Sequence, residues 1–554
     1  MQTNLINQLG DWNPQLLREI KGRLQKRNVL LAITTSFLIQ LGVFLYFQAL
    51  LPNNDSILYP RSNKYCTGTY VDIGNKCFLN SSGNIDINWQ LWFQDIFSCL
   101  SIIGFFAILV SGTYLLINDL ANEERRDTLN FIRLSPQSPQ SILFGKMLGV
   151  PILIYLGLSV AIPVHLWLGL NAAIPLKYIC SFYLIVITTS LLYFSGALLF
   201  GLVGSWLGGF QAWLGSGAVF GFLLLTQQSL NHPASFDYPC AFLKLINPYY
   251  FINYPDLSNF YWFALPLGKI WVITIGFSLF LHFLGSYFIW QSLQRCFSDR
   301  NATMLSKQQS YVLTIAFTII TIGSANWDRL LSSNNPNYSS PIENIGYLIF
   351  LNFFLFLYLI AALTPHRHTL QDWARYRHMA YQQGSKNTLI QDLIWGEKSP
   401  GVVAIAINAI IAITGLSLLT LIYLSSINDK FSTLIALIFA GSLAIIYAAL
   451  TQLLLLMKNG QRLFWTNGIL GAVIILPVFA LAILFSYPEK HTLLWLLSVA
   501  APLIALHPPS GVSLITLLLA IMGHAGILGL LLFQMTRQLK KVGESATKQL
   551  LAGN

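Results

Sequence analysis

Residues 29–51, VLLAITTSFLIQLGVFLYFQALL, form an apolar stretch without Lys, Arg, Asp or Glu. A helix of about 20 apolar residues crosses the roughly 30 Å hydrocarbon core of a bilayer and satisfies its backbone polar groups internally. Eleven similar stretches follow, at residues 96–118, 147–171, 178–204, 210–228, 270–293, 311–325, 345–364, 401–425, 432–457, 466–486 and 512–535. The sequence therefore predicts an all-α, polytopic membrane protein with about 12 transmembrane helices.

The composition agrees with a membrane location. Of the 554 residues, 55% are hydrophobic and 10% are charged, and the mean hydropathy is +0.60. Soluble domains usually carry about 25% charged residues. No connection between the apolar stretches is long enough for a soluble catalytic domain of about 100 residues. The protein is therefore expected to act within the membrane or through a partner.

The distribution of basic residues predicts the orientation. Of the 32 Lys and Arg residues, 23 lie on one predicted side of the membrane, in residues 1–28, 119–146, 294–310, 365–400, 458–465 and 536–554. Because basic connections favour the cytoplasmic side, both termini are predicted to be cytoplasmic. We attribute the net charge of +11 to this asymmetry and to anionic lipid headgroups, and we expect no nucleic-acid partner.

The segment before the first span predicts an amphipathic helix on the inner membrane surface, over residues 13–28. Asn13 suits the N-cap and Pro14 the first helical position. Apolar side chains recur on one face at Leu16, Leu17, Ile20 and Leu24, and five basic residues would reach the headgroups: Arg18, Lys21, Arg23, Lys26 and Arg27. The alternative is a basic stop before the first span.

The two halves of the chain resemble each other at an offset of 254 residues. Tyr193 aligns with Tyr447, and Gly-Ala-Val occurs at both 217–219 and 471–473. The sixth and twelfth spans each carry one histidine, His282 and His524. We therefore predict two six-helix repeats, with a cytoplasmic N-terminus over 1–28, a first six-span domain over 29–295, a second, divergent one over 296–535, and a cytoplasmic tail over 536–554.

The outer connections contain two further features. A Pro-broken apolar segment follows the fifth span of each half, at residues 243–251 and 494–506. Neither segment predicts a clean span. The second could be a thirteenth span, but we expect it to be re-entrant, because an odd number of spans would place the basic tail outside. In the first outer loop, Cys66 and Cys77 could form a disulfide in an oxidising compartment, with two free thiols as the alternative.

The connection between spans 2 and 3 has the most specific sequence, NEERRDTLNFIRLSPQSPQSILFGK over residues 122–146. It resembles the cytoplasmic signature of ABC transporter permeases of the type-2 exporter class. The residues that match are Glu123, Glu124, Arg125, Thr128, Leu129, Leu134, Ser135, Pro136, Gly145 and Lys146. The family usually has Gly before Thr-Leu, where this chain has Asp127. The resemblance covers about residues 13–295 well; in the divergent second half, Gly396-Glu397-Lys398 is the counterpart proposed for Gly145-Lys146.

The resemblance implies that a short helix in this loop couples the chain to a separate ATPase subunit. The coupling residues it implies are Glu123, Glu124, Arg125, Arg126, Thr128, Leu129 and Ile132. Leu129 and Ile132 would supply apolar contacts to a cleft of the ATPase, and the charged residues would set the register by ion pairing. The alternative is an ordinary charged connector.

The chain has no motif of its own for ATP or for catalysis. Gly145-Lys146 lacks the upstream glycine and the following hydroxyl of a P-loop. ATP and Mg are therefore expected on the partner subunit, with no cofactor in this chain. The sequence also lacks a serine nucleophile elbow, His-Glu-x-x-His and a paired-Cys zinc motif, so we expect a transport subunit without catalytic or metal-ligating residues and not an enzyme.

Two groups of histidines are candidates for functional sites. His366, His368 and His378 lie in the second inner loop, where a basic coupling surface is preferred to a metal site because Cys and acidic ligands at reliable spacing are missing. His282 and His524 are the ionisable residues expected in mid-membrane, and they are candidates for the translocation pathway. The alternative for each is a hydrogen bond to a neighbouring helix.

The sequence thus predicts the permease of an ATP-driven ABC transporter, most simply an exporter, in a bacterial inner membrane. An internal photosynthetic-type membrane is the alternative location, and membrane lipids and a periplasmic accessory protein are further expected partners. An ion-coupled secondary transporter is the second hypothesis, although no Asp, Glu or Lys is found inside the predicted spans. A membrane-embedded lipid or glycan transferase is the third, using the outer acids Asp86, Asp95, Asp237 and Asp256.

Overall fold

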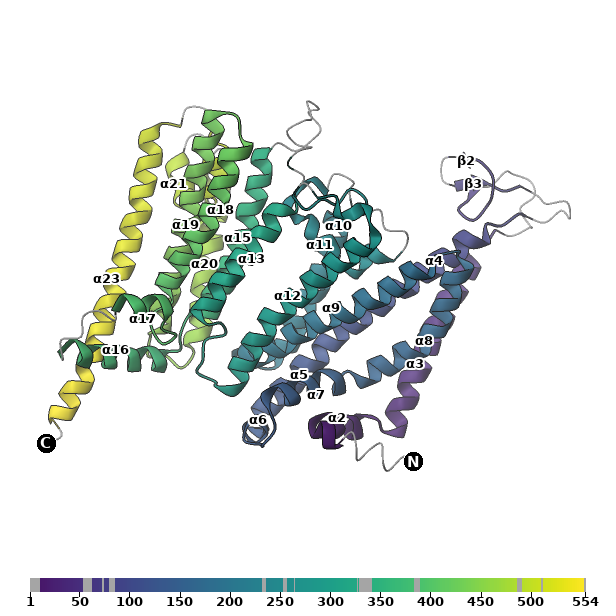
Figure 1. Ribbon diagram of the computed structural model, residues 1–554, viewed down its shortest axis with the longest axis horizontal. Helices are drawn as coiled ribbons and strands as arrows, with labels where there is room; N and C mark the ends of the chain where they lie inside the picture. The colour runs from purple at the N-terminus through teal and green to yellow at the C-terminus, as the bar shows by residue number, and fades with distance from the viewer. Residues whose placement is uncertain are drawn as a thin grey trace. The chain divides into compact units, whose positions relative to one another are not determined.

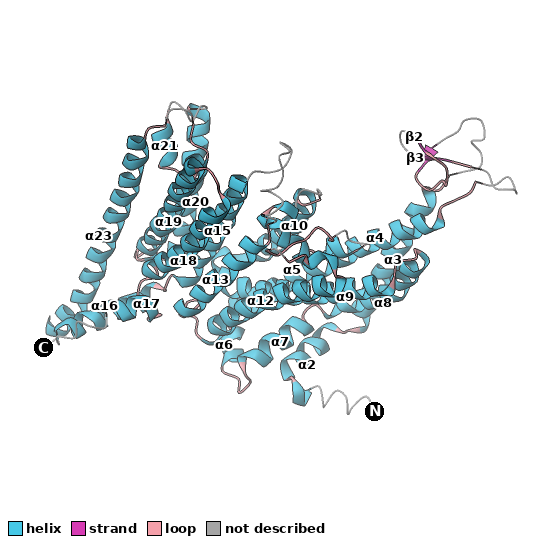
Figure 2. Cartoon of the chain, turned by 45° about the horizontal axis from the view of Figure 1, so that its top comes forward, coloured by secondary structure: helices cyan, strands magenta, loops and turns pink. Residues whose placement is uncertain are grey.

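The computed structural model describes residues 10–52, 62–71, 74–78, 85–231, 236–252, 257–263, 265–325, 327, 341–382, 389–485, 491–509 and 512–552. Most of these residues are helical (Figures 1 and 2). They form two compact units: the first comprises Met1–Asn231, Leu243–Leu257 and Ile270–Trp290, and the second comprises His232–Phe242, Ser258–Lys269 and Gln291–Asn554. The predicted outer acid Asp256 and the first nine residues of the N-terminal domain lie outside the described residues.

Ten helical segments among the described residues are long and apolar enough to cross a membrane: Lys26–Ala49, Trp89–Arg125, Ile152–Asn171, Leu176–Ser229, Trp271–Ser298, Pro341–Leu363, Val402–Tyr423, Ile427–Leu455, Arg462–Leu484 and Leu514–Gly543. The prediction of a polytopic helical membrane protein is confirmed at this level. The difference from the predicted count has two sources. Leu176–Ser229 contains two of the predicted spans, and the helix at the predicted seventh span, Lys307–Gly323, has 17 residues.

Exposed apolar surface explains why these helices need a bilayer. The helices α3 (Lys26–Ala49) and α20 (Arg462–Leu484) are each only 6% buried over their apolar windows. On α3, Leu30 is 65% exposed and Leu38 is 67% exposed. Soluble monomers rarely expose continuous apolar surface of this extent, so these faces are suited to contact with lipid.

The first unit is built around a central helix that leads to the predicted coupling loop. Its helices are α2 (Pro14–Arg23), α3, α4 (Trp89–Phe106), α5 (Gly112–Arg125), α6 (Thr128–Arg133), α7 (Pro139–Gly149), α8 (Ile152–Asn171), α9 (Leu176–Val203), α10 (Gln211–Ser229), most of α11 (Phe242–Ile246) and most of α12 (Trp271–Ser298). The central helix α5 packs against α9 and α10, while α3 and α4 pack on α8. α5 then runs directly into the loop that carries α6 (Figure 1).

Two irregular turns interrupt the long helices of this unit. The π-helical turn η2 (Ala107–Ser111) joins α4 and α5 into one helical segment of 37 residues. The 3₁₀ turn η3 (Gly204–Phe210) separates α9 from α10, and Gly208 within it has a φ of 59°, which glycine adopts without steric cost. π-helical turns are rare and occur frequently at functional sites.

The described part of the connection between α3 and α4, the predicted first outer loop, contains three short antiparallel strands: β1 (Ser62–Asn63), β2 (Tyr70–Val71) and β3 (Gly74–Lys76), in the order β1-β3-β2. Cys66 and Cys77 are joined by a disulfide. Next to the disulfide, the Tyr65 hydroxyl donates a hydrogen bond to Asp95 Oδ2 at 2.8 Å. The loop is therefore covalently closed and attached to the first turns of α4.

The second unit has its own central helix. Its elements are the 3₁₀ turns η5 (Pro239–Ala241) and η7 (Leu267–Lys269), and the helices α13 (Lys307–Gly323), α15 (Pro341–Leu363), α16 (Arg367–Gln382), α17 (Leu389–Trp395), α18 (Val402–Tyr423), α19 (Ile427–Leu455), α20, α21 (Thr492–Leu496), α22 (Ala501–Leu506) and α23 (Leu514–Ala552). α19 is 67% buried over its apolar window and contacts α15, α18, α20, α22 and α23. It forms the core of this unit.

Short broken helices occur at both of the predicted Pro-broken outer segments. In the first unit, α11 has 5 residues and is followed by the 3₁₀ turn η6 (Pro248–Phe251). In the second unit, α21 has 5 residues and α22 has 6. Helices of this length rise by less than about 10 Å, which is too short to cross a bilayer. Residues 491–507 therefore form no single spanning helix.

Candidate functional site

The N-terminal helix is shorter than the sequence predicts. α2 begins at Pro14, and the Asn13 side chain caps it by accepting a hydrogen bond from the Leu16 N–H at 2.9 Å. The helix ends at Arg23, and α3 begins at Lys26. The last two of the five basic residues therefore belong to the first long helix.

α2 packs closely on α7 because two glycines of α7 lie beneath it. A Cβ atom at Gly145 would lie 2.7 Å from Asn13 Oδ1, and one at Gly149 would lie 2.5 Å from the Cβ of Glu19. The Asn13 amide also donates to the Ser141 carbonyl oxygen at 2.8 Å. Any larger side chain at the two glycines would displace α2, so the close approach depends on glycine.

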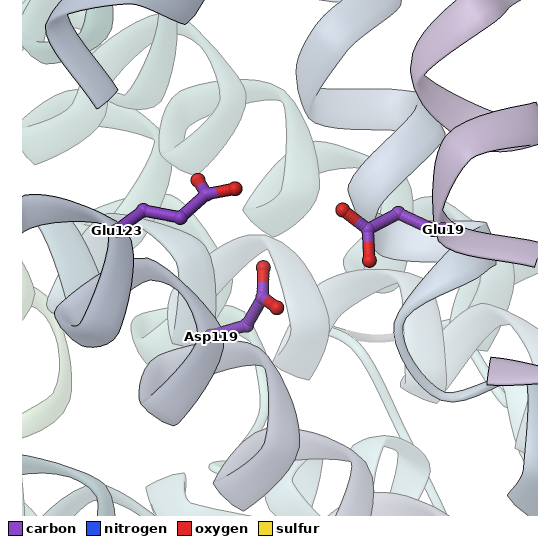
Figure 3. A group of neighbouring side chains, drawn as sticks. All are labelled: Glu19, Asp119 and Glu123. Carbon is purple, nitrogen blue, oxygen red and sulfur yellow. The ribbon is translucent and has the colours of Figure 1, made fainter. Parts of the chain in front are cut away.

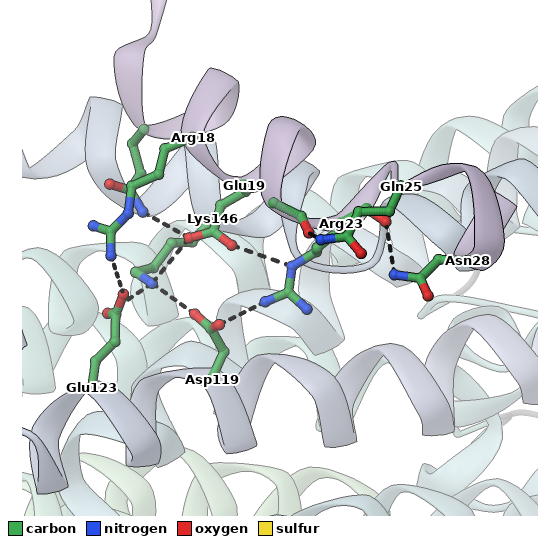
Figure 4. Close-up of polar contacts among 10 residues, drawn as sticks. Arg18, Glu19, Arg23, Gln25, Asn28, Asp119, Glu123 and Lys146 are labelled. Carbon is green, nitrogen blue, oxygen red and sulfur yellow. Dashed lines mark hydrogen bonds and ion pairs between the residues drawn. The ribbon is translucent and has the colours of Figure 1, made fainter.

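A buried lysine lies where α2, α5 and α7 meet (Figure 4). The Lys146 side chain has no exposed surface, and its Nζ lies 2.7 Å from Asp119 Oδ2, 2.7 Å from Glu123 Oε2 and 3.7 Å from Glu19 Oε1. Asp119 and Glu123 are four residues apart and share one face of α5, whereas Glu19 comes from α2. We call these four residues the Lys146 cluster.

Two arginines of α2 complete the network (Figure 4). Arg23 donates to Asp119 Oδ1 at 2.6 Å and to Glu19 Oε2 at 3.2 Å. Arg18 Nη2 lies 3.9 Å from Glu123 Oε1. Three carboxylates thus face three cationic side chains, which offsets the cost of burying them.

The charge state of the lysine follows from its neighbours. Burial alone would lower the pKa of Lys146, but the attraction of Asp119, then Glu123 and Glu19, outweighs burial and raises it. Lys146 is therefore charged at neutral pH. The cluster joins three helices electrostatically, directly behind the loop that carries α6.

The three carboxylates of the cluster point toward one another (Figure 3). Their oxygens lie within 4.8 Å of one another, which would suit a hard divalent cation. The Lys146 ammonium already lies among them, so the chain supplies its own countercharge. Within the described residues no other group of three or more candidate ligands was found, and the histidines of the second predicted inner loop form none.

The predicted coupling residues lie at the end of α5 and along α6. Glu123 belongs to the Lys146 cluster, and Thr128 Oγ1 donates to the Glu123 carbonyl oxygen at 3.1 Å. Arg125 and Arg126 are exposed. Some of the predicted residues therefore hold the loop in place, and others are accessible from outside.

α6 turns a different apolar face outward from the one that the sequence suggested. Leu129 is only 2% exposed, and Ile132 and Glu124 are partly buried. Phe131, by contrast, is 76% exposed, and Leu134 is 84% exposed. We call Phe131 and Leu134 the α6 apolar pair. From the sequence, Leu134 matches the family motif but is not among the predicted coupling residues, and Phe131 is in neither group.

Asp127 makes the turn between α5 and α6. Its φ of 55° and ψ of 10° are in the left-handed region. Glycine reaches this region without steric cost, and Asp is among the few other residues that tolerate it. Asp127 therefore adopts a backbone conformation that favours glycine.

The second unit also buries a lysine at its predicted inner loop. Lys307 begins α13, is 2% exposed, and donates to the Leu393 carbonyl oxygen and to Ser399 Oγ, both at 2.6 Å. Burial lowers the pKa of Lys307 to about 8. Lys398, the proposed counterpart of Lys146, is exposed. The two buried lysines thus have different partners, carboxylates for Lys146 and uncharged oxygens for Lys307. The second loop is also held by ion pairs of Arg295 with Glu397 and of Arg377 with Asp392.

His282 of α12 lies between two other elements of the first unit. Its Nε2 is 2.8 Å from Thr189 Oγ1 of α9. Its Nδ1 is 2.8 Å from the carbonyl oxygen of Ser278 on α12 itself, and Ser278 Oγ donates to the Leu245 carbonyl oxygen of α11 at 2.6 Å. The His282 side chain is 1% exposed. His282 and Ser278 therefore connect α12 to α9 and to the short helix α11.

His524 of α23 also bonds to a hydroxyl group and a carbonyl oxygen in the second unit, with the roles of the two ring nitrogens exchanged. Its Nδ1 is 2.7 Å from Ser442 Oγ of α19, and its Nε2 is 3.0 Å from the carbonyl oxygen of Leu496, the last residue of α21. Its side chain is 3% exposed. In both units a histidine bonds to a hydroxyl group of a neighbouring long helix. His524 also bonds directly to the end of a five-residue helix, whereas beside His282 the Ser278 hydroxyl makes that bond.

A third histidine in a candidate membrane span was missed from the sequence. His165 of α8 is 6% exposed, with Nε2 2.7 Å from Ser101 Oγ and Nδ1 2.7 Å from the Tyr183 hydroxyl. The two partners come from α4 and α9. His165 could have been identified from the sequence, because a single ionisable residue inside an apolar stretch is a functional candidate by default.

Comparison of the chain with protein-family models, with curated proteins and with solved structures finds no match.

Proposed function

We propose that this chain is the transmembrane permease of an ATP-driven ABC transporter of the type-2 exporter class, working with a separate ATPase subunit. The observation that carries the proposal is the α6 apolar pair. α6 is a six-residue helix on the connection between two long apolar helices. It exposes Phe131 and, directly after its last residue, Leu134, while Leu129 is buried. Large exposed side chains on a short, fixed helix are suited to a pocket of a partner protein.

The Lys146 cluster supports a mechanical role for this loop. Its ion pairs connect α5, which precedes α6, to α7, which follows it, and to α2. A force applied to α6 would therefore move α5, α7 and α2 as one body. ATP binding would close the ATPase subunits, displace α6, and drive rearrangement of the long helices.

A second docking element is proposed on α17. This seven-residue helix exposes Ile390 by 71% and Trp395 by 54%, and Lys307 holds its C-terminal end. Two docking helices agree with two six-helix repeats and twelve spans, in which α9, α10 and α13 each count as one span. The matching environments of His282 and His524 support the same repeat. In this arrangement the loops face the cytoplasm, where ATP and Mg bind to the partner.

The test is co-purification of the tagged full-length chain from host membranes in a gentle detergent. We expect wild type to retain a P-loop ATPase subunit, identified by mass spectrometry, together with vanadate-sensitive ATP hydrolysis. Replacing the α6 apolar pair, in Phe131→Ser/Leu134→Ser, should reduce the retained ATPase by at least tenfold, because each buried aromatic or aliphatic contact contributes about 1.5–3 kcal/mol.

Phe78→Ser provides the matched control, because Phe78 is 55% exposed on the predicted outer loop. This variant should retain the ATPase at the wild-type level. Absence of any ATPase from the wild-type preparation, or equal recovery with the α6 double variant, would contradict the proposal.

A further inference from the structure

A cavity of about 650 Å³ lies within the first unit, bounded by α3, α4, α8 and α9. One face of α3 lines it from Asn28 to Gln40, a rise of about 18 Å along the helix. This length exceeds half of the roughly 30 Å hydrocarbon core. Ligand sites usually measure about 300–1,000 Å³ and are mostly apolar with a few polar groups. The cavity is thus large enough for a ligand and is elongated along the spanning helices.

The charge of the lining restricts the ligand. None of the described residues that line the cavity is Lys, Arg, Asp or Glu. A charged group brought into such surroundings would lose its hydration without gaining a counterion. The part of the ligand that enters the cavity is therefore uncharged.

A chain of hydrogen bonds determines whether the polar side chains of the cavity wall can donate to a ligand or accept from it. The Ser101 hydroxyl donates to the Phe97 carbonyl oxygen at 2.8 Å, so its oxygen accepts from His165 Nε2 at 2.7 Å. A neutral imidazole then accepts at Nδ1 from the Tyr183 hydroxyl at 2.7 Å. The proton of Tyr183 is thereby used, and its oxygen retains only acceptor capacity.

Gln40 contributes a second acceptor. Its side chain is 9% exposed, and its Nε2 donates to the carbonyl oxygen of Ser36 at 3.2 Å and to Ser36 Oγ at 3.1 Å. Ser36 Oγ in turn donates to the Gly157 carbonyl oxygen at 2.7 Å. Within the part of the chain that the structure describes, Gln40 Oε1 accepts no hydrogen bond. An apolar cavity with free acceptors is complementary to a ligand that brings a donor.

The backbone of the wall is also irregular at this cavity. Ala107 and Ile108 of the π-helical turn η2 line it. A π-helical turn displaces the side chains of one helix relative to regular spacing, and it persists where surrounding contacts favour it. A buried polar network and the π-helical turn found among the described long helices therefore meet at the same cavity.

We propose that this cavity binds a neutral membrane lipid, with one aliphatic chain along α3 and a hydroxyl group donating to Gln40 Oε1 or to the Tyr183 oxygen. A lipid is the occupant that the observations favour, because α3 is only 6% buried and presents the cavity wall next to bilayer-exposed apolar surface. The elongated shape suits an aliphatic chain, and the two acceptors select a hydroxyl. The assignment does not depend on the proposed ATPase partner.

The experiment uses the purified full-length chain in lipid nanodiscs and diazirine-bearing 1-hexadecanol as the photolabel. We expect labelled peptides from α3 and α8. Ala161→Phe, which fills the lining on α8, should reduce this labelling at least fivefold. Ala218→Phe, on an exposed position of α10, is the matched control and should leave it unchanged.

Gln40→Leu tests the hydroxyl separately, because it removes the acceptor and keeps the side-chain volume. Labelling by the alcohol should fall about fivefold, the effect of one lost hydrogen bond. Labelling by diazirine-bearing hexadecane should stay at its wild-type level. Unchanged alcohol labelling in both Ala161→Phe and Gln40→Leu, or labelling spread evenly over α10, would show annular lipid only and would overturn the proposal.

Discussion

Among single residues, Lys146 has the most consequential position. Its motif, Gly-Lys at the start of the third span, identified the residue from the sequence, but not its partners. In the structure the glycine allows α2 to approach, and the lysine neutralises carboxylates from α2 and α5. Two adjacent motif residues therefore have one structural role, which is to attach α2 to α5 and α7, the helices on either side of α6.

Lys146→Met should destabilise the first unit by about 3–5 kcal/mol, because it leaves three carboxylates without their buried countercharge. Thermal unfolding in detergent, followed by tryptophan fluorescence, measures the effect. Lys398→Met removes an exposed lysine instead and should change stability by less than about 0.5 kcal/mol. Similar melting temperatures for the two variants would contradict a supporting role for Lys146.

Lys307 predicts a pH dependence of stability. Its pKa is lowered to about 8 in the folded chain, whereas an unfolded lysine has a pKa of about 10.4. Between these values the unfolded state binds more protons, so the contribution of Lys307 to stability rises as the pH increases from about 8 to about 10.4. The melting temperature of wild type relative to Lys307→Met should increase over this window. A constant difference between pH 7 and pH 10 would rule this out.

At the scale of elements, local sequence and tertiary packing determine different features of the N-terminal helix. Asn13 and Pro14 define where α2 begins, as their residue types predict. The end of α2, and the face that it buries, depend on α7. Leu16 and Glu19 are both buried against it, so the buried face includes a charged residue that an apolar pattern does not identify.

Gly149→Leu should separate α2 from α7, since a Cβ at Gly149 already meets the Glu19 side chain at 2.5 Å. Overpacking of this kind costs about 1–3 kcal/mol. Hydrogen–deuterium exchange should show faster exchange of the α2 amides. Gly22→Leu is the control on α2 itself, because a Cβ there meets nothing within 4 Å. Equal exchange in the two variants would argue against close α2–α7 packing.

The sequence motif does not predict which face of α6 is exposed. Leu129 and Ile132 are three residues apart, and so are Phe131 and Leu134, so both pairs have helical spacing. Which pair faces outward is set by the orientation of α6 on the end of α5. Because Asp127 takes a left-handed conformation, α6 leaves α5 in a direction that buries Leu129.

At the scale of the whole molecule, the two compact units share one device in spite of their divergent sequences. In each unit a five-residue helix is held next to a histidine that bonds to a hydroxyl group of another long helix. The two buried lysines at the predicted inner loops, by contrast, have different partners.

Substitution of the two histidines should act separately in the two units. His282→Leu should increase amide exchange in α11 only, and His524→Leu should increase it in α21 only, each by the loss of hydrogen bonds that contribute about 0.5–1.5 kcal/mol apiece. The double variant should show the sum of the two effects, because sites that share no partner usually add. Exchange that rises in both short helices after one substitution would contradict independent units.

The sequence by itself determined the membrane fold class, the approximate extents of most long helices, the helix start at Pro14 and the location of the loop that carries α6. These properties depend on local composition and capping, because any apolar stretch of sufficient length is stable as a helix in lipid. Only the tertiary structure decided the partners of Lys146, the outward face of α6 and the cavity beside His165. Ser101 and His165 are 64 positions apart, and their contact depends on how α4 and α8 pack. The polar groups of an apolar helix must find partners wherever its neighbours supply them, and no local pattern specifies which helix that will be.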